Sequence, residues 1–253
     1  MNSKPAYVRK MFGSIARRYD LANHVLSCGI DFYWRARAAD IVASWQPGKI
    51  ADLATGTGDL ALALQKKLPD ADITGVDFLP EMLELARQKG VRHVVLADAM
   101  RLPFADASFD CVTIAFGLRN LENYSAGLAE ICRVLNTHGH LLVLEFSLPS
   151  MPILRATYRF YLHRCLPLLG SCLTQRKSAY DYLGESIEQF PSGNAMCELM
   201  RAKGYDSPSF KRLTGGIVTI YTAAKRQTHC EKLKKGESPL PQPGKRATKT
   251  SRD

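Results

Sequence analysis

Hydrophobic and polar positions alternate along the middle of the chain in a pattern typical of strands and helices that follow one another. Short apolar runs are bounded by glycine, proline or aspartate, and longer stretches carry apolar residues three or four positions apart. We therefore predict strands over 50–53, 71–77, 91–98, 109–116 and 140–147, and helices over 8–19, 34–45, 59–67, 80–89 and 125–135. This alternation predicts a parallel sheet covered on both faces.

The regular rhythm fails after Pro149. Residues 149–191 are rich in Leu, Tyr, Phe and Arg, and we interpret them as a helical cap inserted before a helix at 192–203. Two last apolar segments, 205–213 and 217–223, flank a pair of glycines and predict an antiparallel hairpin that ends the sheet. The predicted fold is an α/β, Rossmann-like, mostly parallel seven-stranded sheet with an antiparallel last strand.

Length and charge divide the chain unevenly. A chain of 253 residues favours one α/β domain, which we place at 1–225, followed by a basic tail at 226–253 that we expect to be disordered. The stretch 225–253 holds nine Lys or Arg and three acidic residues, so it carries +6 of the net charge of +10. Seven scattered cysteines without paired spacing fit a reducing, cytoplasmic compartment, and no metal site is predicted.

The first predicted strand runs into a glycine turn with the sequence Asp-Leu-Ala-Thr-Gly-Thr-Gly-Asp at 52–59. Gly56 and Gly58 allow a ligand to approach the backbone closely, and Asp77 closes the next strand, where a carboxylate receives ribose hydroxyls. The spacing alone fits both a nicotinamide dinucleotide and S-adenosylmethionine. Asp59 at the helix N-terminus would repel a pyrophosphate, and Asp52 and Asp59 would attract a sulfonium ligand, so the charges favour S-adenosylmethionine.

The carboxyl ends of the other strands nominate the rest of a site, because ligands of open parallel sheets bind there. Asp98 suits an exocyclic adenine amine, with Ala99 beside it. The segment 115–120, Ala-Phe-Gly-Leu-Arg-Asn, would place a cation and an amide beside the transferred group. Arg119 is too basic to act as a base, but it would stabilise an oxyanion or orient a water; a structural salt bridge is the alternative.

The segments 116–120, 142–147 (Leu-Val-Leu-Glu-Phe-Ser) and 182–191 (Tyr-Leu-Gly-Glu-Ser-Ile-Glu-Gln-Phe-Pro), together with 18–20 and 27–35, resemble the ubiquinone/menaquinone biosynthesis C-methyltransferase family. The resemblance covers about 8–225. It implies a class I S-adenosylmethionine-dependent fold and methyl transfer to a ring carbon of a prenylated quinol, with demethylmenaquinol favoured. It also implies that Thr57, Asp77, Asp98 and Ala99 contact the cofactor, with the glycine turn at its methionine end.

Three positions depart from the family pattern. Ala115 stands where a serine often touches the cofactor, so one hydrogen bond is expected to be missing. Ala22 replaces a usual methionine, and the segment 136–140 replaces a usual Lys-Pro-Gly-Gly turn. We expect the first two changes to affect ligand contacts and the third to affect only a turn.

Transfer to carbon needs an electron-rich ring, so a hydroxyl proton must leave the quinol. We predict that Arg119 steadies the forming phenolate, that Asn120 and Tyr19 hydrogen-bond to it, and that a water or His24 takes the proton.

A greasy cap with Arg155, Arg159 and Arg164 suits peripheral membrane association, and a homo-oligomer is possible. Nucleic acid is an unlikely partner because no basic stripe with aromatic residues is visible. A methyltransferase for another small phenol or for RNA, and a non-catalytic binder of S-adenosylmethionine, are the alternatives.

Overall fold

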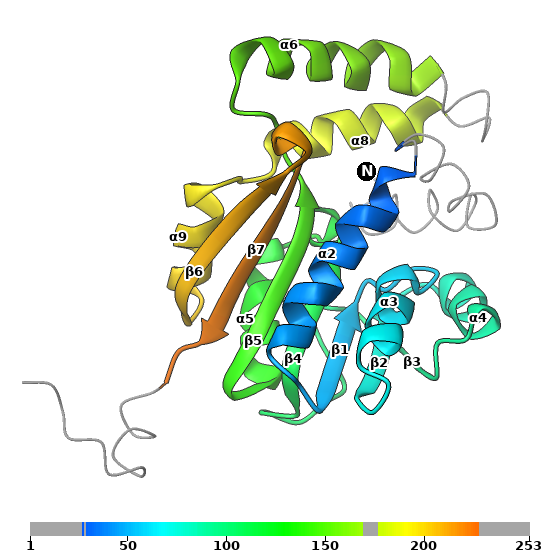
Figure 1. Ribbon diagram of the computed structural model, residues 1–253, viewed down its shortest axis with the longest axis vertical. Coiled ribbons are helices and arrows are strands. Elements are labelled where there is room, and N and C mark those ends of the chain that lie inside the picture. The colour runs from blue at the N-terminus through cyan, green and yellow to red at the C-terminus, as the bar shows by residue number, and fades with distance from the viewer. Residues whose placement is uncertain (1–26, 28, 169–176, 228–253) are drawn as a thin grey trace, which may run out of the picture.

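The computed structural model describes residues 27, 29–168 and 177–227, and its centre is one seven-stranded sheet (Figure 1). The strands are β1 Lys49–Leu53, β2 Asp72–Asp77, β3 His93–Leu96, β4 Phe109–Ala115, β5 Leu135–Phe146, β6 Tyr205–Leu213 and β7 Val218–Lys225. Their order is β3-β2-β1-β4-β5-β7-β6. The chain reverses its winding direction between β1 and β4, which are parallel neighbours, and this switch opens a crevice at their carboxyl ends.

Helices cover both faces of the sheet, and a separate apolar core lies under the helices of each face. On one face α2 Ile30–Ser44 and α3 Asp59–Lys67 pack with part of α4 Pro80–Lys89; on the other lie α5 Tyr124–Val134 and α9 Asn194–Ala202. Figure 1 shows α2 crossing the front of the sheet. Successive side chains of β5 point to opposite faces of the sheet and pack in the two cores in turn. Leu141 and Val143 belong to one core, and Leu142 and Leu144 belong to the other.

The predicted elements are present wherever the structure describes them, with differences at three places. The strand expected at 140–147 begins at Leu135, because Leu135 already pairs with Phe109 and the bend at His138 (φ 68°) stays inside the strand. The strand expected at 91–98 is shorter and ends at Leu96. The helix expected at 34–45 begins four residues earlier, at Ile30. The predicted hairpin forms, and its last strand β7 is antiparallel to β5 as predicted, with β6 at the edge of the sheet.

Helical segments follow β5 where the cap was predicted. They are α6 Pro152–Phe160, the π-helical turn η2 Tyr161–Cys165 and α8 Lys177–Gln189. Tyr158, Leu162, Leu166 and Ile187 form a small apolar cluster between them. Figure 1 shows α6 alongside α8 as the outermost element at the carboxyl-end side of β5. None of the helices in the described ranges is long and apolar enough to cross a membrane.

Candidate active site

The glycine turn between β1 and α3 adopts a left-handed backbone at two of its glycines. Gly56 has φ 57° and Gly58 has φ 88°. A Cβ at Gly56 would meet nothing within 4 Å, so the backbone there faces open space, whereas a Cβ at Gly58 would lie 2.4 Å from Val91 Cγ2. Gly56 therefore leaves room for a ligand, and Gly58 allows α3 and α4 to pack closely.

Asp77 closes β2 directly beside this turn. Its Oδ2 accepts the Gly56 N–H at 2.9 Å and its Oδ1 accepts the Leu79 N–H at 3.0 Å. The side chain is almost fully buried, and burial raises the pKa of Asp77 against the opposing effect of these backbone hydrogen bonds. Each carboxylate oxygen keeps a second lone pair, so Asp77 can accept two further hydrogen bonds from a bound nucleoside.

Asp52 is held at the end of β1 by two threonine hydroxyl groups. Its two oxygens accept hydrogen bonds from Thr55 Oγ1 at 2.6 Å and Thr113 Oγ1 at 2.7 Å, and the residue is 1% exposed. Burial raises the pKa of Asp52 to about 6, although both threonine hydrogen bonds act to lower it. Asp52 borders the site mainly as the anchor that ties the turn to β1 and β4.

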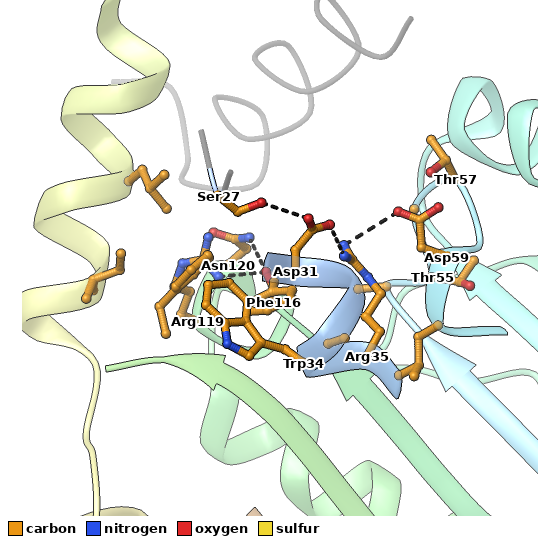
Figure 2. Close-up of a pocket in the computed structure, with 18 of the residues that line it drawn as sticks. Ser27, Asp31, Trp34, Arg35, Thr55, Thr57, Asp59, Phe116, Arg119 and Asn120 are labelled. Atoms are coloured by element: carbon orange, nitrogen blue, oxygen red, sulfur yellow. Dashed lines mark hydrogen bonds and ion pairs between the residues drawn. The ribbon is translucent and has the colours of Figure 1, made fainter. Parts of the chain in front are cut away.

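Asp59 carries no unbalanced negative charge, which removes one step of the charge argument made from the sequence. Its Oδ1 lies 2.7 Å from Lys89 Nζ, and its Oδ2 lies 3.6 Å from a guanidinium nitrogen of Arg35. Lys89 also donates to Thr57 Oγ1 at 2.9 Å, and Arg35 forms an ion pair with Asp31. Figure 2 shows this chain of polar groups running from Ser27 to the glycine turn.

The end of β3 supplies Asp98 and Ala99, as predicted. Asp98 is exposed, and its Oδ1 accepts the Met100 N–H at 2.8 Å, which fixes the side chain at the rim of the site. Ala99 is buried beneath it. The pair leaves one Asp98 oxygen for a ligand amine.

The end of β4 is held in a strained turn. Phe116 has φ 56°, an uncommon conformation for a bulky residue that costs about 1–3 kcal/mol. Its carbonyl accepts hydrogen bonds from Arg119 at 2.7 Å and from Asn120 Nδ2 at 3.2 Å, while its N–H donates to Leu144 O. These contacts offset the strain and hold Arg119 and Asn120 against Phe116 (Figure 2).

Arg119 is paired with Glu145 from the neighbouring strand β5. A guanidinium nitrogen lies 2.5 Å from Glu145 Oε1, and the side chains are 4% and 0% exposed. The Arg119 backbone N–H points to the other Glu145 oxygen at 3.3 Å. The salt bridge that the sequence left as an alternative is therefore present, and it neutralises the charge that a phenolate would otherwise meet.

Asn120 links the strand ends to the cap. Its Oδ1 lies 3.4 Å from the hydroxyl of Tyr182, which comes from α8. Next to Asn120, the rings of Phe116, Trp34 and Phe146 form a cluster with centroids 4.5–6.1 Å apart. The polar pair and the aromatic cluster lie at the boundary between the sheet and the cap.

A cavity of about 500 Å³ joins these groups. It is bordered by nine of the predicted site residues: Asp52, Gly56, Thr57, Asp77, Asp98, Ala99, Ala115, Arg119 and Asn120. Gly58 does not border the cavity, because it faces Val91. Tyr19 and His24 lie outside the described residues.

The cap completes the cavity with residues from α6, η2 and α8. Leu154, Tyr158, Tyr161 and Leu162 border it from α6 and η2, and Tyr182 and Ile187 border it from α8. Burial raises the pKa of Tyr158 above its usual range, so this phenol stays protonated. Tyr182, Arg35 and Phe116 stand in the segments 182–191, 27–35 and 116–120 that carried the family resemblance, which was the available signal, whereas no pattern pointed to Tyr158.

The sequence of the chain is similar to a family of methyltransferases. A family model described as the ubiE/COQ5 methyltransferase family matches residues 1–225. A demethylmenaquinone methyltransferase of Deinococcus radiodurans is 44% identical over 224 residues, which cover 87% of this chain and 92% of that protein. One from Thermus thermophilus is 46% identical over 217 residues, which cover 83% and 98%. A ubiquinone/menaquinone biosynthesis C-methyltransferase UbiE of Citrifermentans bemidjiense is 42% identical over 233 residues, with 89% and 99% covered.

Solved structures of other methyltransferases share the fold. A methyltransferase of Thermotoga maritima, described as a possible histamine N-methyltransferase, superposes with a TM-score of 0.59 at 20% identity and covers 85% of this chain and 100% of that one. Human N-acetylserotonin methyltransferase in complex with S-adenosylmethionine gives 0.59 at 19% identity, covering 86% and 58%. The Rossmann-like class I fold predicted from the sequence is thereby confirmed.

Proposed function

The chain belongs to the ubiE/COQ5 methyltransferase family, and we propose that it transfers a methyl group to a ring carbon of a prenylated quinol, with demethylmenaquinol as the favoured acceptor. It is an S-adenosylmethionine-dependent C-methyltransferase of quinone biosynthesis. The headgroup and the residue roles below are our proposal.

The observation that carries the proposal is the two-sided character of the cavity. One end is formed by the polar strand ends, with Asp77, Asp98 and Asn120, and the other by apolar cap residues such as Leu154, Leu162 and Leu166. A charged nucleoside donor needs polar surroundings and a prenylated acceptor needs apolar ones, and a single cavity offers both. A polyanion such as RNA would find no basic groove in this cavity, because Arg35 and Arg119 are each paired with a carboxylate.

The residues at the polar end fit S-adenosylmethionine. Asp77 can accept both ribose hydroxyls, and the open backbone at Gly56 leaves room for the methionine arm. Asp98 at the rim can accept an adenine amine. Ala115 borders the cavity but has no polar group, so we expect no hydrogen bond from that position.

When bound, S-adenosylmethionine supplies an electrophilic methyl group on a positively charged sulfur. The chain then has to hold the quinol ring with one carbon in line with that methyl group and to exclude water, which supplies much of the rate. The aromatic cluster and the cap residues around Tyr158 would hold the ring. The hydroxyl proton leaves as the new carbon–carbon bond forms and the sulfur–methyl bond breaks. The displaced ring proton then leaves and the phenol oxygen regains a proton, so one proton is released overall, and we keep a water or His24 as its acceptor.

Arg119 takes a revised role in this proposal. Because Glu145 neutralises it, Arg119 would act mainly by fixing the strained turn at Phe116 and thereby the position of Asn120. Asn120 and Tyr182 would then present the polar contact to the quinol oxygen. Tyr19 is proposed as a further hydrogen-bonding partner.

The proposal is tested by incubating the purified full chain with methyl-labelled S-adenosylmethionine and chemically reduced demethylmenaquinone in detergent, followed by mass analysis of the extracted lipid. Transfer of the labelled methyl group to the quinol ring is expected, and a parallel reaction with demethoxy-type benzoquinol compares the headgroups. Tight cofactor binding without labelled lipid from either quinol would contradict the proposal and favour a non-catalytic binder.

We also propose that the protein works in the cytoplasm as a peripheral protein of the membrane that holds its prenylated acceptor.

A further inference from the structure

Helix α6 exposes large apolar side chains on the face that points away from the cavity. Ile153 is 82% exposed and Phe160 is 63% exposed. They are seven positions apart, which places them on one face of the helix, two turns from each other. Met151 at 63% and Leu168 at 64% extend the exposed apolar surface at either end.

The opposite face of the same segment is already used. Tyr158 and Leu162 are buried in the cluster between α6 and α8, and both border the cavity. The outer face therefore does not contribute to this core. Most large apolar residues of the described chain are buried, and four of the eight strongly exposed ones lie between 151 and 168.

The charge of this segment is of one sign. Residues 149–168 contain Arg155, Arg159 and Arg164 and no Asp or Glu. All three arginines are exposed, and Arg159 lies 2.8 Å from Glu188 of α8. An apolar ridge flanked by arginines complements the interface of an anionic bilayer, where apolar side chains enter the acyl boundary and guanidinium groups meet phosphates.

We propose that the outer face of α6, with Ile153 and Phe160 at its centre, docks on an anionic lipid bilayer. The inference rests on the proposed function, because a prenylated acceptor resides in such a bilayer. Docking on this face would leave the inner face of α6, which borders the cavity, next to the lipid surface.

The test is co-sedimentation of the full chain with vesicles of phosphatidylcholine containing phosphatidylglycerol, compared with vesicles of phosphatidylcholine alone. We expect binding to the anionic vesicles at low salt and weaker binding as salt rises. The variant Ile153→Ser with Phe160→Ser should bind at least about tenfold more weakly, because it removes two side chains that gain free energy on entering the apolar layer. Arg164→Gln should bind more weakly only to the anionic vesicles.

Leu96→Ser is the matched control, because Leu96 is 57% exposed on β3 at the far edge of the sheet. It should bind vesicles as the unaltered chain does. The result that overturns the proposal is equal binding by the Ile153/Phe160 variant, which would assign any membrane affinity to another part such as the basic tail. Absence of vesicle binding by the intact chain would overturn it as well.

Two further measurements separate membrane docking from a dimer interface on the same face and from a failure of the proposed function. Light scattering reports whether the Ile153/Phe160 variant changes oligomeric state; loss of a dimer, with vesicle binding unchanged, would mean that a second copy covers this face. Methylation of a short-chain quinol in detergent should be unaffected, because neither residue borders the cavity. If no quinol is methylated while vesicle binding still depends on Ile153 and Phe160, the proposed function fails and the docking surface stands.

Discussion

Arg119 and Glu145, which are 26 positions apart in the sequence, form a buried ion pair with a nitrogen–oxygen distance of 2.5 Å at the ends of two neighbouring strands. Arg119 belongs to the turn that carries Phe116 and Asn120, and it donates a hydrogen bond to the Phe116 carbonyl at 2.7 Å. The ion pair joins β5 to the site, because Glu145 also accepts the backbone N–H of Arg119 and of Phe146. The stability of the fold and the geometry of the site thus depend on the same two side chains.

Glu145→Gln should lower the free energy of unfolding by about 3–5 kcal/mol, because it leaves the buried Arg119 charge uncompensated. Urea unfolding followed by circular dichroism measures this. Asp206→Asn is the control: it breaks the exposed ion pair of Asp206 with Arg226 and should cost no more than about 1 kcal/mol. A loss for Glu145→Gln as small as the control's would mean that the pair contributes little to stability.

Asp77→Asn should weaken the binding of S-adenosylmethionine by about 10- to 100-fold, since hydrogen bonds to a charged acceptor contribute about 1.5–3 kcal/mol each. The amide also turns one acceptor oxygen into a donor that faces a backbone N–H. Isothermal titration calorimetry gives the dissociation constant. Asp72→Asn, at the exposed start of the same strand, should bind as the unaltered chain does. Equal affinity in both variants would contradict the role given to Asp77.

The two glycines of the turn should separate binding from stability. Gly58→Ala places a methyl group 2.4 Å from Val91 and should cost about 1–3 kcal/mol of unfolding free energy in addition to backbone strain. Gly56→Ala meets no protein atom and should cost about 1 kcal/mol, but its methyl group enters the cavity and should weaken cofactor binding.

Val91→Ala provides the check on this pair. Combined with Gly58→Ala it should recover part of the lost stability, because the overlap is with the Val91 side chain. No recovery in the double variant would place the cost in the left-handed backbone instead. Chemical unfolding and calorimetry on the same preparations measure both quantities.

Local patterns predicted most of the fold, because each strand and helix is specified by its own apolar spacing. The helices at 59–67 and 80–89 have the predicted bounds, whereas β5 was started too late because His138 and Gly139 were interpreted as a turn. The sequence around His138 does not distinguish a residue with positive φ inside a strand from a residue with positive φ in a turn that ends a strand. Only the pairing of Leu135 with Phe109 separates the two cases.

The residues that border the cavity were predicted where they follow strands, whereas contacts between distant segments were missed. Asp59 was assigned a free charge because Lys89 and Arg35 are 30 and 24 positions away in sequence. Arg119 was assigned an available charge because its partner lies on the next strand of the sheet. Such pairings follow from the sheet topology, which a single sequence does not specify at the level of side chains.

Tyr182→Phe should lower the rate of methyl transfer while leaving the affinity for S-adenosylmethionine unchanged. The variant keeps the ring and removes the hydroxyl that lies 3.4 Å from Asn120 Oδ1. A loss of one positioned hydrogen bond corresponds to a rate reduction of about 10-fold or more. Tyr33→Phe, on the exposed side of α2, is the control and should keep full activity. An unchanged rate for Tyr182→Phe would exclude this hydroxyl from the reaction.

Asp52 should make the stability of the cofactor-free protein depend on pH. Its pKa is about 6 in the folded protein and near 3.8 in an unfolded chain. Between these values the folded state holds a proton that the unfolded state has lost, so the unfolding free energy falls as the pH rises. A difference of roughly two pKa units corresponds to about 3 kcal/mol. Asn cannot titrate, so Asp52→Asn should remove this contribution.

The unfolding free energy of the unaltered chain, minus that of Asp52→Asn, should therefore decrease between about pH 4 and pH 7, with most of the change below about pH 6. Asp77 also has a raised pKa, but it is present in both proteins and its contribution largely cancels in the difference. Urea titrations at several pH values measure the curve. A difference that stays flat across this range would mean that Asp52 is ionised throughout, held so by the hydrogen bonds from Thr55 and Thr113.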